Sequence, residues 1–304
     1  MQCGFIGLGM LGARMARQVL EAGHDLKVFD LDPTAVEKLV AKGATGAASA
    51  TEAANQVDVL ITCLPSPDAS LKVMTGTDGV FDAMREGSCW IEMSTTDANE
   101  MIRLAGLAAE RGIEVLECPA TGGVHRAVRG EMTLLVGGDE SLFKRQAALL
   151  ETLSGQVVYM GKIGNASLIK VITNLLCLVD LVAMGEALML AKRGGLDLAK
   201  CYEAITASSG SSREFEDWAP VILNGSLNTG FTTDLGLKDL GFVTDMGRRL
   251  DVPLQLTTVA QKMFEASRER YGGEAWTAHV VKMMEETTGE TLRAPGFDEV
   301  IPNE

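Results

Sequence analysis

The first half of the chain alternates between short strand-like runs and helical patterns. The strand-like runs lie at 2–7, 26–30, 57–64, 89–94, 113–118, 133–138 and 156–161, and helical patterns lie at 10–22, from Pro33 onward, at 97–111 and at 140–153. The run at 57–64 is almost wholly apolar, as is typical of a strand that helices cover on both faces. This alternation predicts a mostly parallel, doubly wound α/β sheet.

The pattern changes after Gly164. A helix begins near Asn165 or Ser167 and can continue to Arg193, where the pair Gly194 and Gly195 ends it. The later segments at 197–207, 214–223, 235–250, 254–271 and 277–287 are all helical in pattern, and strand-like runs are absent from this half of the sequence. We therefore predict two domains, a sheet domain at 1–163 and an all-helical domain at 164–304, joined through the long helix.

The composition argues against two classes of partner. The chain carries 27 basic and 41 acidic side chains, for a net charge of -14, and such a surface repels a phosphate backbone. The basic residues are dispersed, which does not suit an anionic membrane surface. The longest apolar stretch, 168–184, is interrupted by polar residues such as Lys170 and Asp180 and is a poor membrane span. We expect no nucleic acid and no membrane as partners.

The numbers and spacing of cysteines and histidines indicate in which compartment the protein acts and whether it binds a metal ion. Six cysteines are scattered singly without a C-x-x-C pair, which is typical of reduced, buried thiols in a cytoplasmic protein. The start of the sequence lacks the basic and apolar segments of a signal peptide, so none is expected. The three histidines are far apart in the sequence, and we expect no metal site.

A glycine motif directly follows the first predicted strand and opens the first predicted helix. It has the spacing G-x-G-x-x-G and consists of Gly7, Leu8, Gly9, Met10, Leu11 and Gly12. In a dinucleotide-binding turn, the first glycine permits the tight turn, the second lets the backbone approach the pyrophosphate, and the third lets the helix pack close to the sheet. The helix N-terminus offers free N–H groups to the phosphates. The motif predicts a Rossmann-type NAD-binding domain; a glycine-rich turn without a ligand is the alternative.

An acidic residue ends the next predicted strand. Asp30 lies 21 residues after Gly9, close to the spacing of about 20 expected for the acid that binds the ribose hydroxyls. A carboxylate there repels a 2′-phosphate, and Asp32 rather than an arginine follows, so we expect NAD in preference to NADP. The alternative is that Asp30 only caps the turn before Pro33.

Two further strand ends face the same crevice, because ligands of such sheets bind outside the carboxyl ends of the strands. Leu64 and Pro65 follow the third predicted strand, and Thr95 follows the fourth. The Thr95 hydroxyl can hydrogen-bond the cofactor, or it can cap the helical segment that begins at Asp97. The residues alone leave both roles open.

Lys170 lies inside the apolar start of the long helix, with Asn174 four residues later on the same face. Because this helix begins where the nucleotide domain ends, we expect its first turns to line the cleft between the domains and to face the nicotinamide. Desolvation and the positive nicotinamide ring can lower the pKa of a lysine there into the range of an acid–base catalyst. A snorkelling side chain with its ammonium group in water is the alternative.

Four blocks, in order, resemble those of the β-hydroxyacid dehydrogenases, the family of 3-hydroxyisobutyrate dehydrogenase, tartronate semialdehyde reductase and 6-phosphogluconate dehydrogenase. GLGMLG at 7–12 is similar to the family's G-L-G-x-M-G, with Leu11 where Met is usual. ECPATGG at 117–123 is similar to D-A-P-V-S-G-G, with Glu117 for Asp and Thr121 for Ser. GNASLIKVITN at 164–174 is similar to G-x-x-x-x-x-K-x-x-N-N, and FTTDLGLKDL at 231–240 to F-x-x-x-L-x-x-K-D-L. The resemblance covers essentially the whole chain.

The resemblance implies a role for each matching residue. Lys170 is implied to be the catalytic acid/base, and Asn174 to orient the substrate beside it. The implied substrate-carboxylate site consists of Thr121, Gly122 and Gly123. The resemblance further implies that Thr95 and Lys238 contact the cofactor near the nicotinamide, and that Phe231 and Asp239 help to form the cleft from the helical domain. NADP-dependent members carry an Asn-Arg pair after the second strand, whereas FDLD stands here, in agreement with NAD.

We therefore expect an oxidoreductase that transfers a hydride between NAD(H) and a short 3-hydroxy acid or its semialdehyde. We expect first an enzyme that acts on a 3-hydroxyisobutyrate-like substrate. The alternative is an NADH-dependent reductase of tartronate semialdehyde or succinic semialdehyde. An imine reductase and a non-catalytic NAD-binding scaffold are weaker rivals, because both Lys170 and Asn174 are present. His125, Arg126 and Arg129 follow the carboxylate loop and either meet a second polar group of the substrate or are ordinary charges of a helix start. The long apolar helix predicts a homodimer or homotetramer.

Overall fold

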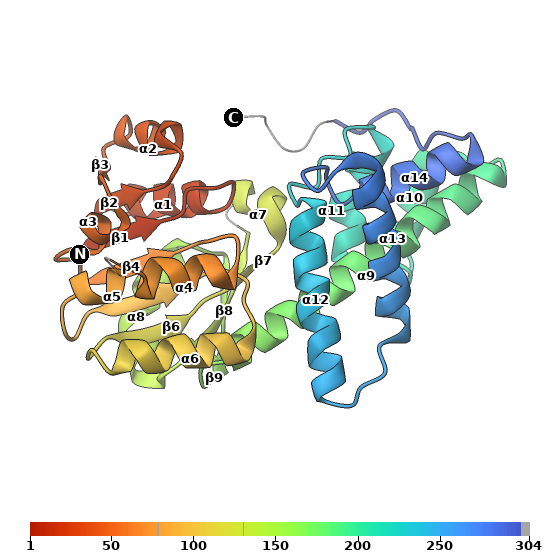
Figure 1. Ribbon diagram of the computed structural model, residues 1–304. Coiled ribbons are helices and arrows are strands. Elements are labelled where there is room, and N and C mark those ends of the chain that lie inside the picture. Colours follow the sequence, from red (N-terminus) through yellow and green to blue (C-terminus); the bar gives the residue numbers. More distant parts are fainter. Residues whose placement is uncertain (78, 130, 299–304) are drawn as a thin grey trace. The chain divides into compact units, whose positions relative to one another are not determined.

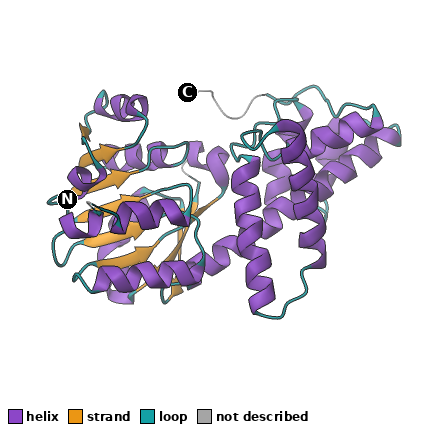
Figure 2. Cartoon of the chain, viewed as in Figure 1, coloured by secondary structure: helices purple, strands orange, loops and turns teal. Residues whose placement is uncertain are grey.

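The computed structural model describes residues 1–77, 79–129 and 131–298 and divides the chain into two compact units, Met1–Lys170 and Val171–Glu304. The first unit contains a sheet flanked by helices, and the second is built from helices (Figures 1 and 2). This arrangement confirms the predicted fold class, an α/β sheet domain followed by an all-helical domain. The exact domain boundary at 163/164 stays a prediction.

The described part of the first unit forms one nine-stranded sheet with the order β3-β2-β1-β4-β5-β6-β8-β7, and β9 pairs with β8. Its strands are β1 (Gln2–Ile6), β2 (Asp25–Phe29), β3 (Thr45–Gly46), β4 (Val59–Thr62), β5 (Cys89–Glu92), β6 (Glu114–Glu117), β7 (Ala120–Thr121), β8 (Thr133–Gly138) and β9 (Gln156–Gly161). Neighbouring strands from β3 through to β6 are parallel, whereas β8 runs antiparallel to β6 and β7. Every strand-like run of the sequence becomes a strand.

Helices cover both faces of this sheet. They are α1 (Gly12–Glu21), α2 (Pro33–Val40), α3 (Ala50–Ala54), α4 (Pro67–Thr75), α5 (Val80–Ala83), α6 (Ala98–Ala109), α7 (Gly123–Arg129) and α8 (Glu140–Thr152). One apolar core packs residues of α1, α2 and α8 against the sheet, and the other packs residues of α3 to α6 against it. Alternate side chains of the central strands contribute to the two cores, which explains why these strands are apolar throughout.

The long helix α9 (Asn165–Arg193) begins in the first unit, and its residues from Val171 onward belong to the second unit. The second unit continues with α10 (Leu198–Thr206), α11 (Arg213–Leu223), α12 (Thr233–Arg249), α13 (Gln255–Tyr271) and α14 (His279–Thr288). Buried residues of all these helices form a single apolar core. Helix α9 is long and apolar enough to cross a membrane by length and composition alone, but half of its most apolar window is buried inside the protein, as in a core helix.

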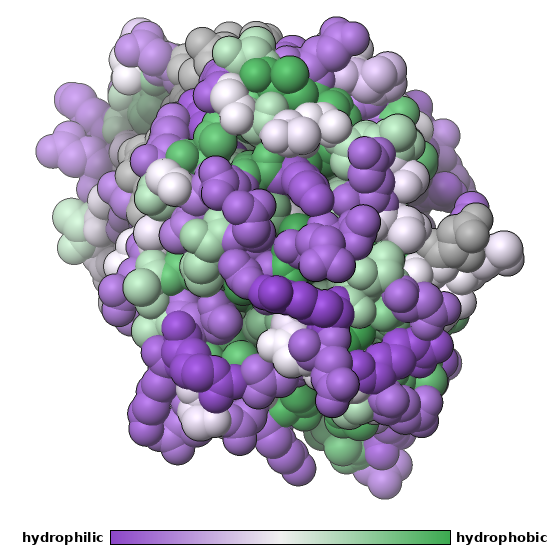
Figure 3. Space-filling view, turned by 90° about the vertical axis from the view of Figure 1, so that its left-hand side faces the viewer, coloured by the Kyte–Doolittle hydropathy of each residue, from purple (hydrophilic) through white to green (hydrophobic). Residues whose placement is uncertain are grey.

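The surface that Figure 3 shows is mostly hydrophilic. Figure 3 shows one face of the molecule, on which hydrophilic side chains predominate and hydrophobic ones form separate small patches. Several ion pairs on the surface join exposed side chains, for example Lys144 with Glu140 and Arg111 with Asp82. Such exposed pairs contribute little to stability, because solvent screens their charges.

All six cysteines are thiols rather than disulfides, and their burial predicts how these thiols react. Burial raises the pKa of Cys89 to about 12 and that of Cys3 to about 11, and it also raises the pKa of Cys118. Cys177 is buried as well, whereas Cys63 and Cys201 are partly exposed. Because the thiolate is the reactive form, we expect a thiol reagent to label Cys63 and Cys201 first in the folded protein.

This labelling is measured by mass spectrometry of peptides after timed treatment with a disulfide-exchange reagent. The unfolded protein serves as the control, since all six thiols react there. Early labelling of Cys89 in the folded protein would contradict the burial that the sheet imposes on it.

Candidate active site

The glycine loop lies at the carboxyl end of β1. Strands β2 and β3 lie on one side of β1 and the later strands lie on the other, so the order of the strands reverses between β1 and β4. Gly7 has a φ of +95°, and a Cβ there would lie 2.3 Å from the Cys63 carbonyl oxygen. A Cβ on Gly12 would lie 2.0 Å from the Gly7 carbonyl oxygen, so α1 approaches the loop more closely than any side chain permits. A Cβ on Gly9, in contrast, has no described atom within 4 Å. The protein itself requires two of the glycines, and the third borders open space of the kind that a pyrophosphate fills.

The helix that follows this loop differs from its neighbours at its N-terminus. Helices α2, α4, α6 and α8 each begin with an Asp or Ser side chain that accepts a hydrogen bond from the first turn. Helix α1 begins after Leu11 and has no side-chain cap among the described residues. Free N–H groups at a helix N-terminus favour a bound anion, so this end of α1 fits the phosphates of a dinucleotide.

Asp30 follows β2 and is joined to the glycine loop. Its Oδ2 accepts a hydrogen bond from Leu8 N at 2.5 Å, and its Oδ1 accepts one from Asp32 N at 2.8 Å. The cap of α2 is Asp32, whose Oδ1 accepts from Thr34 N at 2.9 Å. Asp32 is thus the cap of the helix, while Asp30 does cap the turn before Pro33 through Asp32 N, and its contact with the ribose stays a prediction. The carboxylate is partly exposed beside the loop, where the ribose of a dinucleotide would lie.

A buried hydrogen-bonded network supports the loops after β4 and β5. Leu64 N donates to Ser94 Oγ at 2.7 Å, and Ser94 N donates to Glu92 Oε1 at 2.7 Å. Thr62 Oγ1 donates to Glu92 Oε2 at 3.0 Å, and burial raises the pKa of this carboxyl although these hydrogen bonds oppose the rise. Sequence reasoning missed Glu92; an acidic residue at the end of an otherwise apolar strand was the available signal.

The two other predicted residues of these loops, Pro65 and Thr95, lie directly beside this network. Pro65 is exposed and Thr95 is partly exposed. Asp97 is the residue that caps α6, because its Oδ1 accepts from Asn99 N at 2.9 Å. The alternative role of Thr95 as the cap of that helix is therefore wrong.

The predicted carboxylate loop forms a tight turn between β7 and α7. Thr121 ends β7, and Gly122 and Gly123 have φ values of +113° and +64°, which favour glycine. A Cβ on Gly122 would lie 3.0 Å from Cδ of Arg126, so the stem of this arginine covers the turn. Arg126 Nη1 lies 3.7 Å from Glu131 Oε2. The side chains of His125 and Arg129 lie outside the described residues.

Lys170 lies on the second turn of α9 and is 8% exposed. The snorkelling alternative, with the ammonium group in water, is thereby limited to this small exposed area. Asn174 follows one turn later and is also 8% exposed. The sequence-based placement of both residues on the buried start of a long helix is thus confirmed, although their roles stay predictions.

In the helical unit, three of the predicted residues are in contact. Asn174 Nδ2 donates to Asp239 Oδ2 at 2.5 Å, and Lys238 Nζ lies 3.3 Å from Asp239 Oδ1. Asp239 is 2% exposed, so its charge is compensated by this ion pair and by the amide. Phe231 lies just before α12 and packs against the core of the helical unit. Spacing alone did not indicate that Asn174 and Asp239, 65 residues apart, would be hydrogen-bonded.

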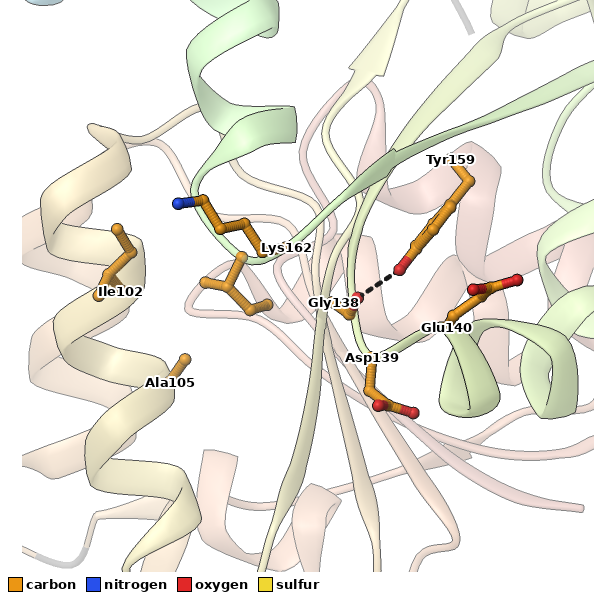
Figure 4. Close-up of a pocket in the computed structure, with 8 residues that line it drawn as sticks. Ile102, Ala105, Gly138, Asp139, Glu140, Tyr159 and Lys162 are labelled. Carbon is orange, nitrogen blue, oxygen red and sulfur yellow. Dashed lines mark hydrogen bonds between the residues drawn. The ribbon is translucent and has the colours of Figure 1, made fainter.

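One open pocket of the first unit lies apart from these residues (Figure 4). It has a volume of about 670 Å³ and is lined by Ile102, Ala105, Gly138, Asp139, Glu140, Tyr159, Lys162 and Ile163. Two of its polar side chains have partners nearby: the Tyr159 hydroxyl donates to the Gly138 carbonyl at 2.8 Å, and Asp139 caps α8. None of the predicted site residues lines it, and we assign it no function.

Two protein-family models match the chain and together span most of it. Residues 2–161 match the NAD-binding domain of 6-phosphogluconate dehydrogenase. Residues 164–284 match the model described as NAD-binding of NADP-dependent 3-hydroxyisobutyrate dehydrogenase.

Similar proteins align with nearly the whole chain. 2-(Hydroxymethyl)glutarate dehydrogenase from Eubacterium barkeri is 32% identical over 290 residues, which is 95% of this chain and 96% of the relative. L-threonate dehydrogenase from Cupriavidus necator is 34% identical over 273 residues, which is 89% of this chain and 92% of the relative. The crystal structure of 3-hydroxyisobutyrate dehydrogenase from Salmonella typhimurium is 32% identical, with a TM-score of 0.85 over 92% of this chain and 99% of that chain.

A Rossmann-type sheet with its glycine loop at the reversal of strand order, followed by an all-helical unit, is the architecture of a nicotinamide-dependent dehydrogenase. The matches to the two family models and to full-length relatives make the assignment more specific. The chain belongs to the β-hydroxyacid dehydrogenase family. It is an NAD-binding hydroxyacid dehydrogenase, as the four sequence blocks predicted.

Proposed function

We propose that this enzyme interconverts a short 3-hydroxy acid and its semialdehyde, with Lys170 as the general acid/base. The observation that carries the proposal is the burial of Lys170 on α9, one turn before Asn174, in a chain of this family. Placing an ammonium group in an apolar helix is costly, and proton transfer to a substrate hydroxyl gives this group a function.

The proposed chemistry divides between the cofactor and the residues of this chain. The glycine loop at 7–12 and Asp30 would hold the dinucleotide, whose nicotinamide would supply the acceptor for the hydride of the carbinol carbon. Lys170, in its neutral form, takes the hydroxyl proton during oxidation, and in reduction its ammonium form returns a proton to the developing alkoxide. Thr121, Gly122 and Gly123 hold the substrate carboxylate, and Asn174 orients the substrate. Such positioning is the larger part of what a protein contributes to a cofactor reaction.

The substrate class follows from the relatives and from the predicted carboxylate loop. 2-(Hydroxymethyl)glutarate and 3-hydroxyisobutyrate, after which two similar proteins are named, share a hydroxymethyl group on the carbon next to a carboxylate. A 3-hydroxyisobutyrate-like acid is therefore our first proposal for this chain. Reduction of tartronate semialdehyde or succinic semialdehyde is the alternative within the same reaction class.

For the cofactor, we propose NAD in preference to NADP. The carboxylate of Asp30 lies at the end of β2 beside the glycine loop, where it would repel the 2′-phosphate of NADP. Asp32, the following acid, caps α2 and adds a second negative charge to the same turn.

An assay of NAD⁺ reduction against a panel of short 3-hydroxy acids tests this function. We expect one group of acids with a hydroxymethyl group beside the carboxylate to be oxidised, and NAD⁺ to be used at least about tenfold better than NADP⁺, which corresponds to about 1.4 kcal/mol of discrimination. NADH appearance is followed by its absorbance, and NADP⁺ is run in parallel. NADH binding without oxidation of any member of the panel would contradict the proposed substrate class. Equal use of both cofactors would contradict the role of Asp30.

We also propose that the enzyme acts in the cytoplasm as a homodimer or homotetramer. The proposal on assembly rests on apolar side chains of α9 that face away from the core, namely Leu176 and Leu190, which are 56% and 75% exposed. Exposed apolar side chains of this size on a long helix are suited to a subunit interface.

A further inference from the structure

Glu117 is a buried carboxyl group to which the family resemblance assigns no role. It ends β6, directly before the loop that carries Thr121, and it is 0% exposed. Burial raises the pKa of this carboxyl, and the hydrogen bonds that it accepts oppose the rise. A fully buried acid is costly unless its oxygens are well satisfied, so its partners indicate its purpose.

Both carboxylate oxygens of Glu117 accept hydrogen bonds from the start of α9. Oε1 accepts from Gly164 N at 2.5 Å and from Ala166 N at 3.0 Å. Oε2 accepts from Ser167 N at 3.0 Å and also from the Ser167 hydroxyl. The N–H groups of a first helical turn have no partner within the helix, and a negative charge is favourable at that end. Glu117 therefore fixes the N-terminus of the helix that carries Lys170.

The backbone around this carboxylate is shaped to admit it. Gly137 is the partner of Glu117 in the pairing of β6 with β8, and a Cβ on Gly137 would lie 2.3 Å from Glu117 Oε1. Gly164, which donates one of the hydrogen bonds, has a φ of +97° that favours glycine. Figure 4 shows Lys162, which lies in the short connection between β9 and the start of α9. These glycines indicate that the position of the carboxylate is built into the fold.

We propose that Glu117 is a positioning residue for the reaction. It holds the first turn of α9 at the end of β6, and the place of this turn sets the place of Lys170, which follows Ser167 by three residues and lies on the same side of the helix. Glu117 also begins the segment that leads to the predicted carboxylate loop. One carboxylate thus fixes the proton-transfer group relative to the root of the loop that is proposed to hold the substrate. This inference rests on the proposed function.

Replacing Glu117 with glutamine tests the inference. The amide keeps the shape of the side chain, but its NH₂ group faces N–H donors of α9, so at least one buried hydrogen bond is lost. We expect kcat for the hydroxy acid to fall by about 10-fold to 10²-fold, the scale of a displaced catalytic group. KM and the dissociation constant for NADH should stay within about twofold, since neither the carboxylate loop nor the glycine loop loses a contact. Hydrogen exchange at the amides of 164–167 should become faster.

Two further variants separate positioning from simple loss of stability. Glu117→Asp keeps the charge and matches the residue of the family pattern, and it should recover most of the lost kcat. Glu285→Gln is the matched control, because Glu285 is also buried, accepts from Leu292 N at 2.6 Å and Arg293 Nη1 at 2.7 Å, and has no proposed role in the site. It should lower the Tm and leave kcat unchanged. An unchanged kcat in Glu117→Gln, an equal fall in Glu285→Gln, or no recovery in Glu117→Asp would each overturn the inference.

The experiment also separates this inference from the proposed function. If the wild-type enzyme oxidises no member of the panel, the proposed function fails. Hydrogen exchange alone then tests whether Glu117 holds the first turn of α9. Amides of 164–167 that exchange in Glu117→Gln as in the wild type would then overturn the inference, and faster exchange would support it. Should Glu117→Gln fail to fold, Ser167→Ala replaces it, because this variant removes only the hydroxyl hydrogen bond. We expect a smaller fall in kcat with faster exchange, and no change in either would overturn the inference.

Discussion

Replacing Lys170 with alanine is expected to lower the turnover of the 3-hydroxy acid by a factor of about 10² or more, the usual contribution of a general acid/base. The reason is that no other group is proposed to take the hydroxyl proton, so the alkoxide must form without a base. The fall should appear in kcat and in kcat/KM to a similar extent, because the interaction is made in the transition state. The measurement is steady-state kinetics together with a fluorescence titration of NADH, whose affinity should change by less than about twofold.

Lys162→Ala is the matched control for this variant. Lys162 lies a few residues earlier in the chain, is exposed, and lines the pocket to which we assign no function. Removing its charge should leave turnover unchanged, which separates the effect of one ammonium group from a general change in charge near α9. Turnover that survives in Lys170→Ala would show that the proposed role of this lysine is wrong.

The second large effect is expected from Gly9→Ala. A methyl group at this position meets no described atom within 4 Å, so the free protein should keep its Tm. The same methyl group would occupy the space through which the backbone approaches a pyrophosphate. We expect the affinity for NADH to fall by about 10-fold or more, which corresponds to at least about 1.4 kcal/mol. The measurement is a fluorescence titration of NADH combined with thermal unfolding.

Gly106→Ala provides the matched control for the glycine loop. Gly106 lies in α6 of the same unit, is exposed, and a Cβ there also meets no described atom within 4 Å. Alanine in a helix interior is favoured over glycine by about 0.8–1.0 kcal/mol, so this variant should be slightly more stable and should bind NADH normally. Equal NADH affinity in Gly9→Ala and Gly106→Ala would contradict the placement of the pyrophosphate at this loop.

The sequence predicted the fold because each of its signals was local. Apolar runs separated by helical patterns located the strands, and the glycine pair at Gly194 and Gly195 located the end of α9, which the structure places at Arg193. The two-residue strands β3 and β7 were not predicted, since so short a run has no periodicity to detect. The antiparallel pairing of β8 with β6 could not be predicted either, because pairing depends on residues far apart in the sequence.

The candidate site was predictable to the extent that its residues carry recognisable motifs. The glycine loop, Asp30, Lys170 and Asn174 were found from spacing and context. The buried carboxyls of Glu92 and Glu117 were not, because their importance comes from partners 30 and about 50 residues away in other strands and in α9. A buried acid in an apolar strand can signal such a role, but only the three-dimensional contacts show which segment it holds.

The pairing of β5 with β6 has a consequence for engineering this enzyme. Glu92 and Glu117 are direct partners in that pairing, one supporting the loops proposed to hold the cofactor and the other the start of α9. A one-residue slip of either strand would turn its carboxylate to the opposite face of the sheet and separate it from its partner. A graft of this chemistry into another scaffold therefore has to carry both strands, and their mutual register, as one unit.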